Sequence, residues 1–115
     1  MLIDDLVDEV LKYNGRLVVI TGGEPLMYDL SFLTQKLKAN GFQINIETSG
    51  AYPISGELDW ICVSPKKFKA PLKEVVAKAN ELKCIIFNKS DFDFAEDNCQ
   101  LTTANCQLYL QTEWS

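Results

Sequence analysis

The stretch VVITGGEP, from Val18 to Pro25, decides how the rest of this 115-residue chain is interpreted. Its three β-branched residues predict a buried strand that ends abruptly at Thr21. Gly22 and Gly23 can adopt positive φ and let the backbone approach another molecule, and Pro25 then stops strand pairing. The pattern is typical of a ligand-facing loop after a strand, and equally of an ordinary turn between a strand and a helix.

Length and charge narrow the class of protein. The chain, residues 1–115, has the size of a single domain. Its 11 basic and 16 acidic residues give a net charge of −5, which argues against a nucleic-acid or anionic-membrane surface because both require clustered positive charge. No apolar run approaches the roughly 18 residues of a membrane-spanning helix, and the acidic start of the chain does not look like a secretion signal.

Histidine is absent, which excludes His-based acid–base catalysis, His metal ligands and Ser-His-Asp triads. The four cysteines contain no Cys-x-x-Cys pair. Cys62 and Cys84 lie in apolar, strand-like runs and are expected to be small buried residues. Cys99 and Cys106 lie in a polar stretch, where they could be metal ligands or form a disulfide; without a secretion signal we expect free thiols.

Apolar periodicity predicts strands that alternate with helices. Because such alternation is typical of right-handed βαβ units, we expect a parallel sheet in an α/β fold. The polar segment 91–105 has no clear periodicity, and its acids lack the spacing of a calcium loop, so it is expected to be a solvated surface. The expected strands are 17–21, 42–46, 60–63, 83–87 and 108–111, and the expected helices are 3–11, 30–37 and 72–79.

Polar residues follow four of the five expected strands. The carboxyl ends of parallel strands share one edge of the sheet, where α/β proteins hold their ligands. Hydroxyls, carboxylates, a lysine and glycine amides should therefore surround one cavity, which predicts a small-molecule site. The four segments are Thr21 to Glu24, Glu47 to Gly50, Ser64 to Lys66, and Gln111 to Glu113.

These motifs also occur in a particular order along the chain. The order is GGEP at Gly22, ETSG at Glu47, Asp59 followed by SPK at Ser64, ELK at Glu81, and LQ at Leu110. In this order and spacing the chain resembles the 7-carboxy-7-deazaguanine synthases, a family of radical S-adenosylmethionine (SAM) enzymes. The resemblance implies an open, partial (β/α)6 barrel, and the five parallel strands expected here resemble its second to sixth strands.

The resemblance also implies roles for matching residues. The Gly23 backbone, with Glu24, would hold the methionine ammonium of SAM, and Gly22 would be a further cofactor-binding residue. Thr21 would face the substrate, 6-carboxytetrahydropterin. Ser49 would be a ribose or methionine contact. Ser64, Pro65 and Lys66 would line SAM, and Lys66 would pair with a carboxylate. Gln111 and Thr112 would lie on the adenosine side.

Each of these residues also has an ordinary structural interpretation. Glu24 could cap the next helix, Ser64 could be a turn residue, and Lys66 could be one solvated lysine among three. Taken singly, we favour the site for Gly23, Glu24 and Lys66. The structural interpretation is favoured for Ser49 and Thr112.

One feature of the family has no counterpart in this sequence. The family holds its 4Fe–4S cluster on a Cys-x3-Cys-x2-Cys loop, next to a threonine that binds Mg²⁺, and no such spacing occurs here. We therefore expect a fragment of a radical SAM core that lacks the first strand, the cluster loop and the C-terminal segment. Such a fragment would have no catalytic or metal-ligating residue and would be inactive. The intact parent would be a cytoplasmic lyase of the queuosine pathway that acts by SAM-dependent radical ring contraction.

Two other functions stay open on the sequence. One is a piece of another radical SAM activating enzyme, of the glycyl-radical activase type. The other is a non-catalytic α/β domain that binds a nucleotide or a partner protein at the same edge of the sheet. The resemblance also implies that the family's first strand would pair beside residues 18–20. Without it, this apolar edge predicts self-association as a dimer or larger, or rearrangement of the first helix to cover the edge.

Overall fold

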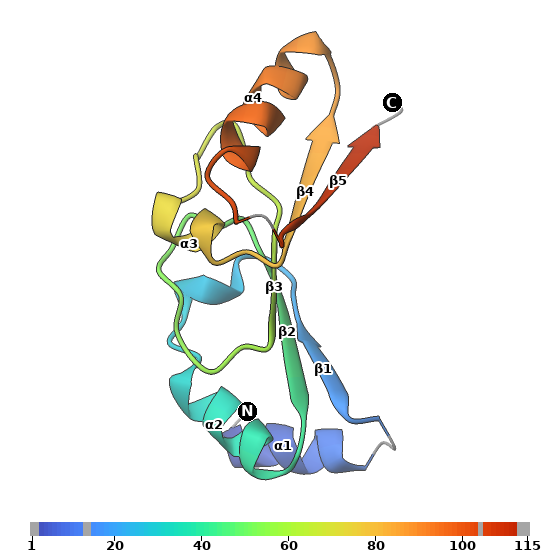
Figure 1. Ribbon diagram of the computed structural model, residues 1–115. Coiled ribbons are helices and arrows are strands. Elements are labelled where there is room, and N and C mark those ends of the chain that lie inside the picture. The colour runs from blue at the N-terminus through green and yellow to red at the C-terminus, as the bar shows by residue number, and fades with distance from the viewer. Residues whose placement is uncertain (1–2, 13–14, 104, 113–115) are drawn as a thin grey trace.

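The computed structural model describes residues 3–12, 15–103 and 105–112 (Figure 1). Helices and strands alternate along the chain, as the periodicity predicts. The helical elements are α1 (Ile3–Leu11), the 3₁₀ turn η1 (Pro25–Met27), α2 (Ser31–Ala39), α3 (Lys73–Ala77) and α4 (Lys89–Cys99). The strands are β1 (Leu17–Ile20), β2 (Gln43–Thr48), β3 (Trp60–Val63), β4 (Glu81–Ile86) and β5 (Gln107–Thr112).

All five strands are parallel, and their order in the sheet is their order in the chain. Parallel crossovers are right-handed almost without exception. A strand order that never reverses therefore places every helix on one face, and Figure 1 shows the helices gathered on one side of the sheet. β1 and β5 do not pair with each other, so the sheet is open. The predicted α/β fold of a partial barrel is confirmed.

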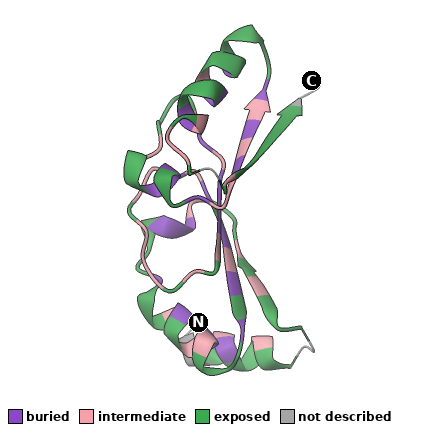
Figure 2. Cartoon of the chain, in the orientation of Figure 1, coloured by how far each residue is buried: buried purple, intermediate pink, exposed green. Residues whose placement is uncertain are grey.

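The hydrophobic core lies between this covered face and the helices. Along β2 the buried residues alternate with accessible ones, and Ile44 and Ile46 are fully buried. The same alternation along β4 directs Leu82, Cys84 and Ile86 towards the helices. Figure 2 shows the buried bands on the central strands, while β1 and β5 carry exposed and half-buried residues. No helix of the described residues covers the other face of the sheet, which is called the open face below.

The polar segment 91–105 differs from expectation, because its first half belongs to α4. Asn88 caps this helix by accepting a hydrogen bond from the Ser90 amide, and Asp91 accepts bonds from the Phe87 and Asn88 amides at 2.7 and 2.9 Å. Asp91 is also buried and pairs with Lys67 at 2.5 Å, so the expectation of a solvated surface is wrong for this residue. These hydrogen bonds compensate for the cost of burying the carboxylate. Because apolar periodicity marks only apolar residues as buried, it could not predict the burial of Asp91.

No helix in the described part of the chain is long and apolar enough to cross a membrane.

Candidate ligand-binding site

A polar cavity of about 210 Å³ lies where β1, β2 and β3 end and extends over the open face of β3 and β4. Its walls carry hydroxyls, a thiol, a carboxylate, two ammonium groups and exposed glycine backbone. Such a mixture suits a polar ligand with both donors and acceptors. The lining residues are Thr21, Gly22, Gly23, Glu47, Thr48, Ser49, Cys62, Ser64, Lys66 and Lys83.

The loop after β1 presents its backbone to this cavity. Gly22 and Gly23 have φ values of 85° and 46°, a region that other residues rarely adopt. A Cβ atom added at either position would meet no heavy atom within 4 Å. The glycines are therefore required for the shape of the loop, and the space beside them is free for a ligand.

Glu24 fixes this loop to the end of β2. One carboxylate oxygen accepts bonds from the Leu26 amide at 2.9 Å and from the Thr48 hydroxyl at 2.7 Å, and the other accepts from the amide and hydroxyl of Ser49 at 2.7 and 2.8 Å. Burial by itself raises the pKa of Glu24, but these hydrogen bonds together bring it below its usual value of 4.5. Glu24 is thus an ionised cap of η1, and its role towards an ammonium stays a prediction.

A row of polar side chains crosses the open face beneath the cavity. The Thr21 hydroxyl donates to Glu47 at 2.9 Å, and Glu47, Cys62 and Glu81 are register partners on β2, β3 and β4. The Glu81 carboxylate accepts from the Cys62 thiol and from the Trp60 indole, both at 3.2 Å. The pKa of Cys62 is raised to about 12, mainly by burial and then by the hydrogen bond to Glu81 and the negative charge of Glu81. The thiol is therefore neutral and acts as a donor.

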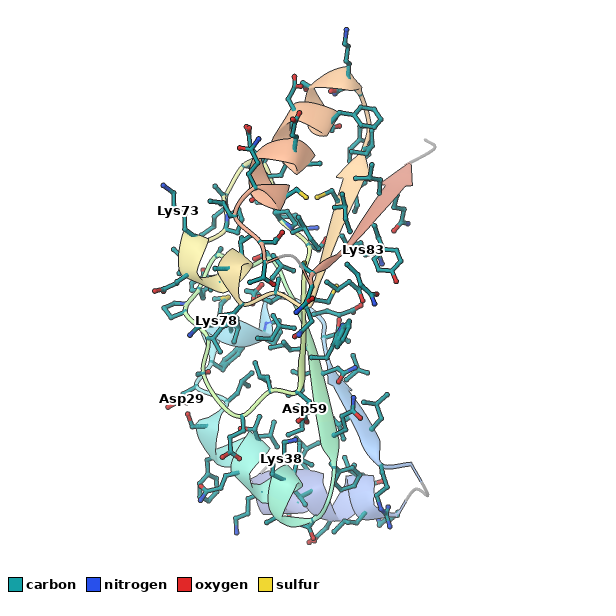
Figure 3. All side chains as sticks on the ribbon, in the orientation of Figure 1. Asp29, Lys38, Asp59, Lys73, Lys78 and Lys83 are labelled. Carbon is teal, nitrogen blue, oxygen red and sulfur yellow. The ribbon has the colours of Figure 1, made fainter. Side chains whose placement is uncertain are left out.

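A second row lies nearer the carboxyl ends of the strands. Val63 pairs with Leu82, so the next residues, Ser64 and Lys83, adjoin across β3 and β4, and Tyr109 is the register partner of Lys83 on β5. Figure 3 shows Lys83 on the side of β4 away from α3. The two rows together place one ammonium group and several hydroxyls next to the carboxylates of Glu47 and Glu81.

The structure brings together six of the ten residues predicted for the site. Pro65 instead lines a second, mostly apolar cavity of about 330 Å³ with Phe68, Phe87 and Phe94. Gln111 lies on the edge strand β5 and lines neither cavity, and the side chain of Thr112 is outside the described part of the structure. Those in the polar cavity are Thr21, Gly22, Gly23, Ser49, Ser64 and Lys66.

Sequence reasoning missed two residues that lie within strands. Cys62 and Lys83 face the open side, whereas the prediction assigned only the polar segments at the ends of the strands to the site. The available signal was the period of two along each strand, since a charged residue between buried apolar ones must face away from the core. Which strand residues share the cavity depends on register, which the sequence does not show directly.

The four cysteines do not form a cluster site. Cys62 faces the open side, whereas Cys84 belongs to the covered core, and burial raises the pKa of Cys84 to about 11. Cys99 and Cys106 are half-buried free thiols. Within the described ranges there is no group of three or more His, Cys, Asp or Glu residues that could hold a metal ion. These residues do not fit a 4Fe–4S cluster, which needs several thiolates around one cuboid.

Comparison with known proteins identifies the family, although no family model matches the chain. The 7-carboxy-7-deazaguanine synthase of Flavobacterium psychrophilum is 52% identical over 112 residues, covering 97% of this chain and 53% of that protein. The synthase of a Synechocystis strain is 46% identical and covers 97% of this chain and 54% of its own length. The chain belongs to the 7-carboxy-7-deazaguanine synthase family.

The structural comparison agrees. The crystal structure of QueE from Escherichia coli superposes with a TM-score of 0.85 at 32% identity, covering 98% of this chain and 54% of that one. The sequence-based prediction of the family and of its radical SAM fold is confirmed. The chain spans about half the length of the curated relatives it matches.

Proposed function

We propose that this chain is the ligand-binding part of a radical SAM enzyme that converts 6-carboxytetrahydropterin to 7-carboxy-7-deazaguanine. The observation that carries the proposal is the convergence of GGEP, ETSG and SPK residues on one polar cavity in a member of the synthase family. The chain is then one domain within a longer radical SAM core, working in the cytoplasm on a small molecule and on neither nucleic acid nor a membrane.

The cavity residues divide between two ligands. The backbone carbonyls of Gly22 and Gly23 would accept hydrogen bonds from the methionine ammonium of SAM. Ser64 and Lys66 would hold its carboxylate, because an ammonium group suits a carboxylate. Pro65, Gln111 and Thr112 would lie on the adenosine side. Thr21 would face the pterin, as would Glu47, to which the Thr21 hydroxyl donates. Ser49 lines the same cavity, but its hydroxyl already donates to Glu24.

A radical SAM enzyme obtains its oxidising radical from SAM and a reduced 4Fe–4S cluster. Since the thiols described above do not fit a cluster, we propose that the cluster and the Mg²⁺ of the active enzyme are held by residues outside this sequence. The 115-residue chain should therefore stay colourless after anaerobic reconstitution with iron and sulfide. A stoichiometric cluster signal in EPR that disappears in a Cys99→Ala, Cys106→Ala variant would contradict this.

A chimera tests the proposal in an active enzyme. The 112 matched residues of the Flavobacterium psychrophilum synthase would be replaced by their counterparts from this chain. We expect the reconstituted chimera to form 7-carboxy-7-deazaguanine from 6-carboxytetrahydropterin. Thr21→Val in the chimera should lower the rate, whereas Lys78→Gln, on the far side of the sheet, should not. A folded chimera that binds its cluster yet makes no product would overturn the proposal.

Binding to the chain itself provides a second test. Without a cluster to ligate the methionine amine and carboxylate, SAM should bind with a dissociation constant on the order of 1 mM or weaker. In NMR titrations, SAM should shift the amide signals of Gly22, Gly23 and Ser64. Micromolar binding would contradict this account of affinity, and shifts confined to other regions would contradict the site.

The edge of β1 supports a proposal about association. Among the described residues β1 pairs only with β2, and Leu17 and Val19 are half exposed along its length. Such an edge can pair with a second copy of the chain. Light scattering should show a dimer or larger species that Val19→Lys shifts to monomer. A monomeric wild type at high concentration would overturn the proposal.

A further inference from the structure

Lys83 is a cation in the wall of the polar cavity with no assigned role. It lies within β4, is half-buried and faces the open side of the sheet. The ion pairs Lys12–Glu9, Lys38–Asp59 and Lys67–Asp91 do not involve Lys83, and among the described residues no carboxylate lies within ion-pair distance of it. A half-buried lysine that lacks a carboxylate partner among the described residues is a candidate partner for an anionic ligand.

The nearest carboxylate on the same strand is already engaged. Glu81 lies two residues before Lys83 on the open face, but its two oxygens accept hydrogen bonds from Trp60 and Cys62. The charge of Lys83 still reaches this row, since it partly opposes the rise in the pKa of Cys62. Trp60 and Cys62 thus hold Glu81 in place, and Lys83 lines the cavity without pairing with it.

The carboxylates near the cavity explain why such a cation is needed. Glu47 lines the cavity and Glu81 adjoins Cys62 on its other side, so a ligand carboxylate in the cavity would be repelled without a compensating positive charge. Two lysines line the cavity. Lys66 follows β3 in a loop and is assigned above to SAM, whereas Lys83 is held by a strand paired on both sides.

We infer that Lys83 binds the carboxylate of a heterocyclic substrate in this cavity. The identity of the substrate rests on the proposed function, in which substrate and product both carry a carboxylate on a fused nitrogen heterocycle. Lys83 thereby distinguishes carboxylated from uncarboxylated heterocycles. It orients the ring with its carboxylate towards the ends of β3 and β4.

The test compares two pterins that differ only in the carboxylate. Dissociation constants of 6-carboxypterin and of pterin would be measured by NMR titration of the 115-residue chain. We expect 6-carboxypterin to bind about tenfold more tightly, the size of effect expected of one charge-assisted hydrogen bond. In Lys83→Gln this advantage should disappear while pterin affinity stays unchanged. Lys83→Arg should keep most of it.

The controls separate this inference from the proposed function. Lys78→Gln removes a lysine near α3, on the other side of the sheet (Figure 3), and should leave both affinities unchanged. If both pterins bind equally, or if the advantage survives in Lys83→Gln, the inference is overturned and the proposed function stands. A third probe, benzoate, isolates the anion. Lys83-dependent shifts with benzoate but no binding of either pterin would support an anion site and overturn the pterin substrate. No response to any probe would overturn both.

Discussion

The two faces of the sheet use the same strands for different purposes. On the covered face Ile46 and Leu82 are fully buried, whereas their neighbours Glu47 and Lys83 line the open cavity. Because strand side chains alternate, each strand contributes to the core with one set of residues and to the site with the other. A parallel sheet is usually covered on both faces. The bare face here is where the family's ligands are proposed to bind.

The largest difference between the faces should appear in truncations of apolar side chains. Ile46→Ala removes a fully buried side chain from the core and should lower the free energy of unfolding by about 2–5 kcal/mol. Val19→Ala, on the open face and 49% exposed, should cost less than about 1 kcal/mol. Urea unfolding measures both. Equal losses would show that the open face is packed in solution, for example by a second copy.

The glycines provide a smaller contrast between the same two sides. Gly50 has a φ of 79°, and a Cβ there would lie 2.9 Å from Pro71 and 3.1 Å from Val63. Gly50→Ala should therefore combine backbone strain with overpacking and cost about 3 kcal/mol. Gly22→Ala meets open space and should cost only the strain, about 1 kcal/mol. Thermal unfolding of the two variants measures these losses of stability. A larger loss for Gly22→Ala than for Gly50→Ala would contradict the described packing.

The fold was largely predictable, for a reason visible in particular segments. Apolar β-branched runs such as Val18 to Ile20 are typical of strands, and Asn40-Gly41 ends α2 as expected. The segment that became α4 was not predictable from periodicity, because its buried side includes Asp91 and Asn98. Their hydrogen bonds, which depend on tertiary contacts such as that with Lys67, permit this burial.

The site was predictable only where it follows the ends of strands. Gly22, Gly23 and Ser64 stand at recognisable positions after apolar runs. Lys83 and Cys62 lie inside such runs, and their place in the cavity depends on which face the helices cover. That choice follows from the strand order, since one direction of crossover around the sheet leaves the other face bare.

The ion pair between Asp91 of α4 and Lys67 predicts that stability depends on pH. The hydrogen bond with Lys67, followed by those from the Asn88 and Phe87 amides, lowers the pKa of Asp91 from 3.8 to about 2. A carboxylate whose pKa is lower in the folded state than in the unfolded state stabilises the protein at pH values above its unfolded-state pKa. This stabilisation is lost as the pH falls, here between about 4 and 2. Urea midpoints should decline less steeply in this interval for Asp91→Asn than for wild type. Parallel declines would contradict the described contacts.

The last prediction compares two buried thiols, one on each face. With pKa values of about 12 and 11, Cys62 and Cys84 should both resist iodoacetamide at pH 8, where only about one thiol in a thousand or fewer is ionised. Burial is the main cause for both, but Glu81 contributes only to Cys62. Glu81→Gln should therefore raise the alkylation rate of Cys62 several-fold and leave Cys84 unchanged, as measured by peptide mass spectrometry.

A matched substitution on α3 separates this local effect from a loosened fold. Glu74→Gln removes the same charge from the covered side and should change neither rate. If Glu81→Gln raises the alkylation rates of both thiols, Glu81 stabilises the sheet in general and opening of the sheet explains the reactivity. If it accelerates Cys62 alone, the carboxylate acts on the thiol directly, as the 3.2 Å contact requires. The open face then carries an electrostatic arrangement that the core beneath it does not share.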